Sequence, residues 1–529
     1  MHSITFLVGQ SSEKYYKEGL GFNVEEKVRG KILVGNNPYF VDDWYFDSDK
    51  HDKLSTRHKY ASVNDWTAAS YFTRLNYSYA GKYMFTGTLR KDGSSKFGKD
   101  SKWGLFPGVS LGWVVSEESF FNINMVDQLK FRASWGSVGN GNIPSYLSQS
   151  LITTKPIVYI GVIPEGPSKS IAWLPDPTLQ WESTNMVDVG FDAFLINRIS
   201  VTSDIYWKTT YNLIWEKRLP MSTGFEKIEA TNLGSIEQFG FELAISGDVI
   251  QSRTDGFNWN ATLTMDHLHG KIVDLPAETP YVSSGDIRSY VGAEIGQIYG
   301  YIVDGIYTSD EELNDPANPN PSAQIGDYKY RDIARVDEFG DIAYVPDTNI
   351  TSADLVNLGS VTPKVSFGFN NTFTYKRFDL NLFFRAAVGN KIYNKSRREL
   401  LNTDGELNLM KEAVNRYPYS NQLIQGARSN RVDPSNGAAL DIFVEDGSYL
   451  RLSNLTLGYN LGSLINRLDI QSLRLYGSIN NVFVLTKYSG LDPDTGAGID
   501  KGPKLVPRGV DENLYPTVRT YSLGLQVTF

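Results

Sequence analysis

The sequence contains no cysteine, which excludes disulfide bonds and thiolate metal sites. It also contains no uninterrupted apolar run of about 18 residues, so no transmembrane helix is expected. Basic residues are too few and too scattered to form a stripe, because 51 Lys and Arg face 60 Asp and Glu and the net charge is −9. Nucleic acid is therefore not an expected partner.

Aromatic residues and glycine are abundant, with Tyr 31, Phe 27 and Gly 47. These residues suit strands with bulges, tight turns and aromatic belts. The mean hydropathy of −0.30 is that of a polar chain. It does not exclude a membrane barrel, because such a barrel turns only every second strand residue toward lipid and carries polar loops.

The clearest pattern is alternation with period two, which indicates strands with one apolar face. In the segment 377–389, for example, Leu380, Leu382 and Phe384 alternate with Asp379 and Asn381. Each segment is about as long as a membrane-spanning strand requires. About fourteen segments show the pattern: 3–10, 71–79, 83–91, 104–116, 128–138, 182–195, 197–212, 236–249, 257–269, 363–375, 377–389, 447–460, 472–485 and 517–529.

The connections between these segments alternate in length. Short connections alternate with long polar connections along the chain. The short connections include 80–82, 196–197 and Lys376. Short periplasmic turns and long external loops are typical of a transmembrane antiparallel up-and-down β-barrel, whereas a soluble all-β binding protein has no reason to sort its loops. We therefore predict an all-β membrane barrel in contact with the lipid bilayer. The main expected external loops are 11–70, 139–181, 270–362, 390–446 and 486–516.

The last segment ends in Phe529, which this orientation puts at the periplasmic side. A terminal aromatic strand residue is a signal for outer-membrane barrel assembly, so Phe529 is the predicted assembly signal. The alternative is an ordinary edge strand that happens to end in phenylalanine.

Several motifs, in order along the chain, resemble the SusC/RagA family of TonB-dependent transporters. Each motif alone is weak, but the ordered set from about residue 70 to 529 is specific to this family. The motifs are 87–98 (GTLRKDGSSKFG) with 103–107 (WGLFP), 179–185 (LQWESTN), 297–301 (QIYGY) with 304–307 (DGIY), 389–394 (GNKIYN), 444–459 (VEDGSYLRLSNLTLGY), 480–483 (NNVF) and 488–494 (YSGLDPD).

This resemblance implies an outer-membrane importer of oligosaccharides or peptides, and not an enzyme. It implies a SusD-like surface lipoprotein as partner, energy from the TonB system, and a barrel of about 22 strands that encloses a plug domain. About fourteen of these strands are expected here, and no plug, TonB-interacting segment or signal peptide is evident. We therefore expect a C-terminal fragment or a truncated gene product. A surface barrel that acts as a receptor or adhesin without transport is the alternative.

Aromatic residues in the predicted external loops are candidates for contact with substrate, although they could equally pack their own loops. The candidates are Tyr159, Trp173, Trp215 and Tyr281. Tryptophans on predicted strands fall at the lipid-facing parity and are expected to contact lipid instead. These are Trp113, Trp135, Trp207 and Trp259.

No metal or cofactor is expected. His267 and His269 share one strand face but lack an evident third ligand. The acidic run 327–341 replaces oxygen donors of a calcium loop with Ala334 and Val336, so it is expected to be a solvated loop. Nothing in the sequence forms a nucleophile elbow or an acid–base constellation.

Overall fold

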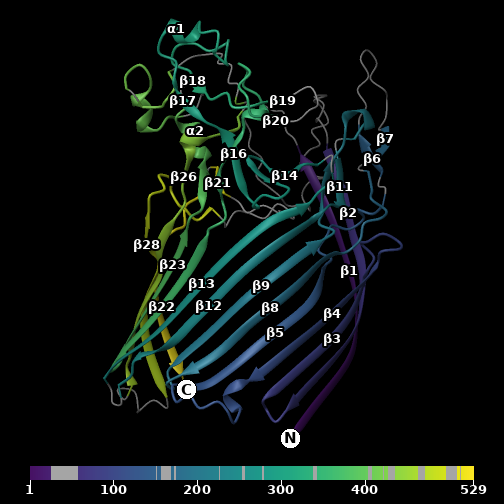
Figure 1. The fold of residues 1–529 in the computed structure, drawn as a ribbon, viewed down its shortest axis with the longest axis vertical. Coiled ribbons are helices and arrows are strands. Elements are labelled where there is room, and N and C mark those ends of the chain that lie inside the picture. The colour runs from purple at the N-terminus through teal and green to yellow at the C-terminus, as the bar shows by residue number, and fades with distance from the viewer. Residues whose placement is uncertain are drawn as a thin grey trace, which may run out of the picture.

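A computed structural model gives the fold, and Figure 1 shows it as a ribbon. It describes the chain apart from these residues: 25–56, 150–151, 156–167, 172–173, 226, 253–255, 277–278, 337–341, 403–407, 421, 427–434, 436, 463–470, 496–508, 513 and 529.

One antiparallel sheet of 14 strands dominates the molecule. Each strand pairs with its neighbours along the chain, and the strands cross Figure 1 at a steep tilt. In the described residues, the first and last strands are each paired on one side only. In order across the sheet the strands are β1 (His2–Val24), β2 (Arg57–Tyr79), β3 (Tyr83–Ser94), β4 (Trp103–Val114), β5 (Val126–Asn140), β8 (Glu182–Leu195), β9 (Ile199–Tyr211), β12 (Ser235–Ile250), β13 (Phe257–Asp274), β22 (Val365–Tyr375), β23 (Phe378–Val388), β27 (Tyr449–Asn460), β28 (Ser472–Thr486) and β30 (Thr520–Thr528).

The fourteen predicted strand segments are confirmed, and apart from β1 and β2, which are longer than predicted, their bounds agree within a few residues. The short connections are tight turns built on left-handed backbone conformations. Ile196 and Asn197, between β8 and β9, have φ of 47° and 53°, and Lys376, between β22 and β23, has φ of 54°. Both termini lie at the end of the sheet away from the elaborate loops (Figure 1).

The expectation that residues 11–70 form a loop is wrong at both ends. β1 continues to Val24 and β2 begins at Arg57, and the two pair without a register shift. The extra length carries mixed polar residues such as Glu13, Lys14 and Lys17. Beyond the bilayer neither face of a strand meets lipid, so the apolar alternation that marks a membrane strand is lost there.

The two faces of the sheet differ sharply. Large apolar side chains remain exposed on one face, where Val187 pairs in register with Trp207 and Val189 with Ile205. Trp113, Trp135 and Trp207 lie on this face, and Trp259 donates a hydrogen bond to Asn371 there (3.0 Å). Polar and charged side chains occupy the other face. We conclude that the apolar face meets lipid and the polar face lines the interior.

The longer connections contain short elements of their own, most of them gathered above one part of the sheet (Figure 1). Two of these elements are short α-helices and several are 3-10 turns. No helix among the described residues is long and apolar enough to cross a membrane. The elements are η1 (Val115–Glu117), β6 (Ile152–Lys155), β7 (Ser168–Ile171), β10 (Ile214–Arg218), η2 (Met221–Thr223), β11 (Lys227–Asn232), β14 (Tyr281–Ser284), β15 (Ile287–Tyr290), β16 (Gln297–Tyr301), β17 (Val303–Ile306), α1 (Asp310–Leu313), β18 (Tyr328–Tyr330), β19 (Arg335–Val336), β20 (Ile342–Ala343), η3 (Ser352–Asp354), β21 (Val356–Ser360), β24 (Lys391–Asn394), α2 (Lys395–Leu400), η4 (Lys411–Asn415), β25 (Ala439–Leu440), η5 (Asp441–Phe443), β26 (Val444–Asp446) and β29 (Val510–Asp511).

Candidate functional site

On the polar face of the sheet, arginines form ion pairs with carboxylates on the adjacent strand and on the strand after it. Arg132 on β5 donates to Asp192 on β8 (Nε to Oδ2, 2.9 Å) and to Asp204 on β9 (Nη2 to Oδ2, 3.1 Å). Gly190 lies between Arg132 and Asp204 in the register, and a Cβ there would stand 2.1 Å from the Asp204 carboxylate. The glycine therefore leaves room for the guanidinium to reach across the intervening strand.

The same arrangement recurs at the C-terminal end of the sheet. Arg474 on β28 donates to Asp379 on β23 (Nε to Oδ1, 2.8 Å). Gly458 on the intervening strand β27 pairs with Asp379, and a Cβ at this position would collide with both side chains. The interior wall thus carries fixed charges of both signs, which is typical of the lining of a polar channel.

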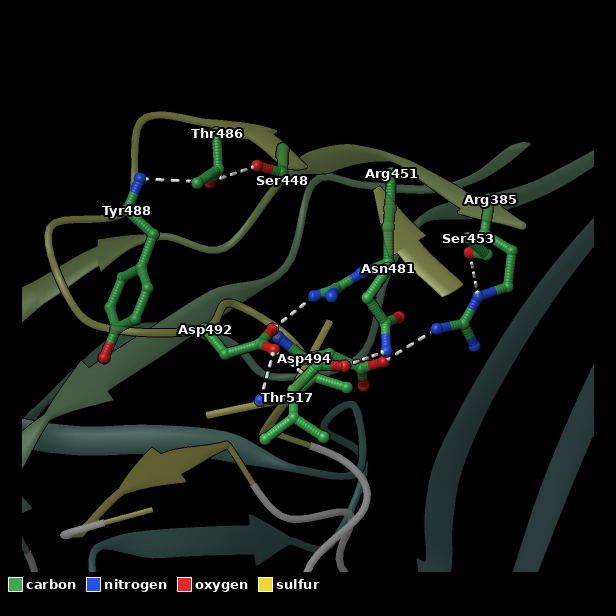
Figure 2. Close-up of polar contacts among 11 residues, drawn as sticks. Arg385, Ser448, Arg451, Ser453, Asn481, Thr486, Tyr488, Asp492, Asp494 and Thr517 are labelled. Carbon is green, nitrogen blue, oxygen red and sulfur yellow. Dashed lines mark hydrogen bonds and ion pairs between the residues drawn. The ribbon is translucent and has the colours of Figure 1, made fainter. Parts of the chain in front are cut away.

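A second group of polar contacts joins the 487–519 connection to the upper end of the wall (Figure 2). Arg451 on β27 forms an ion pair with Asp492, and its side chain is only 4% exposed. Asp492 also accepts hydrogen bonds from the amide of Asp494 (2.9 Å) and from the amide of Thr517 (3.3 Å). One carboxylate therefore holds both arms of the connection against the strand.

Two β-bulges position the neighbouring contacts. The register shift leaves Ser453 on β27 unpaired, together with Asn481 and Val482 on β28, and Asn481 has φ of 53°. The Ser453 hydroxyl accepts a hydrogen bond from Arg385 (3.1 Å), and Arg385 also pairs with Asp494 (3.2 Å), as Figure 2 shows. The bulges lie within two of the motif segments, 444–459 and 480–483, so part of each motif serves the backbone geometry of the wall.

Burial and hydrogen bonding shift the pKa values of this group. Burial opposes ionisation of Asp492, yet the hydrogen bonds from Thr517 and Asp494 and the charge of Arg451 lower the net pKa of its carboxyl. Burial and a hydrogen bond donated to Asp511 (2.6 Å) raise the pKa of the Tyr488 phenol. Tyr488 is thus neutral and Asp492 ionised at neutral pH, which is what these contacts require.

Three of the external connections share one hydrophobic core, and we call this unit the loop domain. It consists of described residues of 275–364, 389–448 and 487–519. Parallel pairing joins β16 to β25 and β24 to β29, which links the three connections in turn. The core contains Ile287, Ile298, Tyr301, Val303, Ile306, Tyr328, Tyr330, Val361, Tyr393, Leu401, Ala413, Ile424, Ala439, Leu440 and Phe443. These connections are therefore a folded body, and several of their aromatic residues serve its packing.

One face of the loop domain presents three tyrosines in a row, which we call the tyrosine platform. Tyr281, Tyr290 and Tyr299 come from β14, β15 and β16, and consecutive ring centroids are 4.8 Å apart. Arg288 lies over the Tyr281 ring (5.0 Å) and the Tyr299 ring (6.0 Å), and donates to the Tyr290 hydroxyl (3.3 Å). All four side chains are half-buried.

The predicted substrate-contact residues fall into different environments. Tyr159 and Trp173 lie outside the described residues, and so does the predicted assembly signal, Phe529. Trp215 packs on a small buried cluster that includes Leu213, so it contributes to loop packing. Tyr281 is part of the tyrosine platform. Sequence reasoning missed Tyr290, Tyr299 and Arg288, whose strands are too short to show a period.

Replacing Trp215 by alanine is expected to loosen the β10–β11 hairpin by about 1–2 kcal/mol, because roughly half of a large apolar side chain loses its contacts. Limited proteolysis of the purified protein would then show faster cleavage near residues 214–232, while Trp215→Phe remains close to the natural protein. A loss of ligand affinity in Trp215→Ala without faster cleavage would instead make Trp215 a contact residue.

Nothing in the described part of the chain gathers three or more His, Asp or Glu side chains as a metal would require. His267 and His269 lie at the lipid-facing parity, beyond the point where β22 stops pairing with β13. His267 contacts the carbonyl oxygen of Lys364 (2.5 Å).

In the acidic run 327–341, the carboxylate of Asp332 accepts a hydrogen bond from the backbone amide of Asp347 (2.9 Å), and residues 337–341 lie outside the described residues.

Comparison with known proteins identifies close resemblance across nearly the whole chain. The family model described as "TonB dependent receptor-like, beta-barrel" matches residues 5–482. TonB-dependent receptor SusC of Bacteroides thetaiotaomicron is 30% identical over 500 residues, which cover 92% of this chain and 46% of SusC. TonB-dependent receptor P26 of Formosa agariphila is 32% identical over 475 residues, covering 87% of this chain and 46% of P26.

Solved structures agree on the fold. The RagAB peptide transporter matches with a TM-score of 0.78 and 23% identity, over 100% of this chain and 53% of the other. The chain thus spans about half the length of the relatives it matches. The motif resemblance to SusC is confirmed by these matches. The chain belongs to the TonB-dependent receptor-like β-barrel family of the outer membrane, whose members are transporters and receptors and not enzymes.

Proposed function

We propose that the protein imports oligomeric nutrients, either oligosaccharides or peptides, across the outer membrane. In this proposal the chain supplies interior wall and external mouth. A SusD-like surface lipoprotein delivers the substrate, and the TonB system provides energy through the plug region expected of this family. The observation that carries the proposal is the contrast between the apolar outer face and the charged inner face of the sheet. A folded loop domain is formed by the external connections of the same sheet.

Each part of this arrangement suits passage of a polar solute. The apolar face anchors the strands in lipid. The paired charges on the inner face, such as Arg132 with Asp192 and Arg474 with Asp379, keep the interior hydrated without a strong net field that would trap one sign of ion. The loop domain holds side chains at the mouth in fixed positions, because its three connections share one core. Rigid positioning lowers the entropy cost of binding a substrate there.

The test measures uptake and surface binding separately. Deleting the gene from its host should abolish uptake of labelled oligosaccharides or peptides while uptake of the matching monomers continues. Inactivating TonB should abolish uptake and leave surface binding intact. Binding in the natural strain without any TonB-dependent uptake would instead favour the non-transporting receptor or adhesin.

A further inference from the structure

The strands that carry the tyrosine platform have one buried face, which we call the back, and one partly exposed face, which we call the front. Alternate residues of β14, β15 and β16 point to opposite faces. Val282, Ile287 and Ile298, on the back, are at most 2% exposed and belong to hydrophobic clusters. The front carries Tyr281, Arg288, Tyr290, Tyr299 and the polar Gln297, and in the strand register Tyr281 pairs with Tyr290 and Arg288 with Gln297. The tyrosine rings are therefore held at fixed spacing on a surface that retains solvent contact.

Arg288 differs from two other arginines of the loop domain, Arg331 and Arg397, in its partners. Arg331 is paired with Asp304 (Nε to Oδ1, 3.0 Å), and Arg397 is hydrogen-bonded to Glu412 (Nε to Oε2, 3.3 Å). Among the described residues, Arg288 has no carboxylate partner and is held by the tyrosine rings and one phenol hydroxyl.

The nearest acidic residue in the sequence, Asp286, attracts Arg288 electrostatically but forms no ion pair with it in the described part of the chain. Asp286 instead accepts a hydrogen bond from the amide of Ala439 (3.2 Å), and burial raises the pKa of its carboxyl. A guanidinium has five donors, of which the Tyr290 hydroxyl takes one. The platform therefore offers a positive, planar donor group that is already oriented and that no carboxylate of the described residues contacts directly.

The chemistry of the platform indicates its ligand. Tyrosine faces attract the weakly positive C–H edges of flat or ring-shaped molecules, and three faces in a row match several consecutive units. An arginine between them binds carboxylates, preferably through two parallel hydrogen bonds. We propose that the tyrosine platform binds an acidic oligosaccharide, with a sugar carboxylate on Arg288 and sugar rings on Tyr281, Tyr290 and Tyr299. This rests on the proposed function and narrows its substrate class.

The test compares two probes that differ only in charge. The probes are a tetramer of galacturonic acid and the same tetramer with its carboxylates reduced to alcohols, each titrated calorimetrically into the protein purified from the outer membrane in detergent. The natural protein should bind the acidic tetramer about tenfold or more tightly than the reduced one. Arg288→Gln should remove this preference, and Arg288→Lys should restore only part of it, because lysine lacks the planar fork.

A matched control separates loss of a binding group from loss of folding. Arg331→Gln changes an arginine of the same domain that already has a carboxylate partner, so it should leave the affinity for the acidic tetramer unchanged. Tyr290→Phe should reduce it modestly, because the ring stays and the hydroxyl that orients Arg288 is lost.

Three results would overturn the inference. These are equal binding of both tetramers by the natural protein, an unchanged preference in Arg288→Gln, and tighter binding of a tetraglutamate peptide than of the acidic tetramer. None of these results would refute the proposed import function, because that depends on TonB-dependent uptake in cells, which is measured without reference to ligand charge.

Discussion

Replacing Leu382 by arginine is expected to destabilise the folded protein in lipid by about 2–4 kcal/mol, the cost of an arginine facing lipid near the bilayer midplane. Leu382 lies in the middle of β23 and pairs with Asn371 and Leu455. Its neighbours at the same parity on β23, Leu380 and Phe384, are apolar, and the amide oxygen of Asn371 opposite already accepts a hydrogen bond from Trp259 (3.0 Å), so the guanidinium would face mainly apolar groups. Urea-induced unfolding in lipid vesicles, followed by tryptophan fluorescence, measures the change.

The adjacent residue provides the control. The Asn381 side chain faces the interior and donates to Asn370 (2.9 Å) and Thr372 (3.1 Å). Asn381→Arg should cost only about 1 kcal/mol, the value of hydrogen bonds lost where water can replace them. Equal costs for the two variants, large or small, would mean that the two faces of β23 are not distinguished by the membrane.

The strands of the sheet could be predicted from the sequence because their pattern has one local cause. A residue facing lipid must be apolar and the next one need not be, so alternation marks each membrane segment without knowledge of its neighbours. The pattern ends where the membrane ends. That is why the outer halves of β1 and β2, with residues such as Lys14 and Asn64, were not predicted.

The loop domain could not be predicted because its core is assembled from distant segments. Ile298 and Leu440 belong to the core and Val510 packs against it; these three residues come from three different connections, and none of them sits in a segment with a recognisable period. Strands of four or five residues with a buried back, such as β15, contain too few alternations to be distinguished from a loop. The tyrosine platform depends on their register, so the sequence alone could suggest Tyr281 but not its neighbours.

Several residues of the family motifs that the structure describes have roles in packing and backbone geometry. Phe97 and Leu179, from two motifs, are at most 1% exposed in one cluster, and Trp181 packs against Phe97 with centroids 4.6 Å apart. Gly98 approaches the Pro177 carbonyl so closely that a Cβ would stand 2.1 Å from it. Such residues identify the fold. Substrate preference is instead expected from loop-domain positions outside these motifs, such as Arg288.

Removing the carboxylate of Asp492 is expected to cost about 3–5 kcal/mol, because it leaves the Arg451 guanidinium buried without its partner. The Arg451 and Asp492 side chains are 4% and 12% exposed, and the Nε of Arg451 already lacks a hydrogen-bond partner. Asp492→Ala also frees both arms of the 487–519 connection, since Asp494 and Thr517 lose their acceptor. Urea unfolding in vesicles and proteolysis of this connection report the two effects.

A control variant and a pH series distinguish loss of the Arg451–Asp492 ion pair from general destabilisation of the protein. Asp494→Ala breaks the Arg385–Asp494 pair, whose side chains are 45% and 28% exposed, and should cost at most about 1 kcal/mol. Because the pKa of folded Asp492 is lowered below the unfolded value of about 3.9, its contribution is complete well above pH 4 and is lost as the pH falls through the folded pKa. The stability difference between the natural protein and Asp492→Asn should therefore shrink on acidification below about pH 4. A difference that stays constant over this range would show that the carboxylate charge does not hold the connection in place.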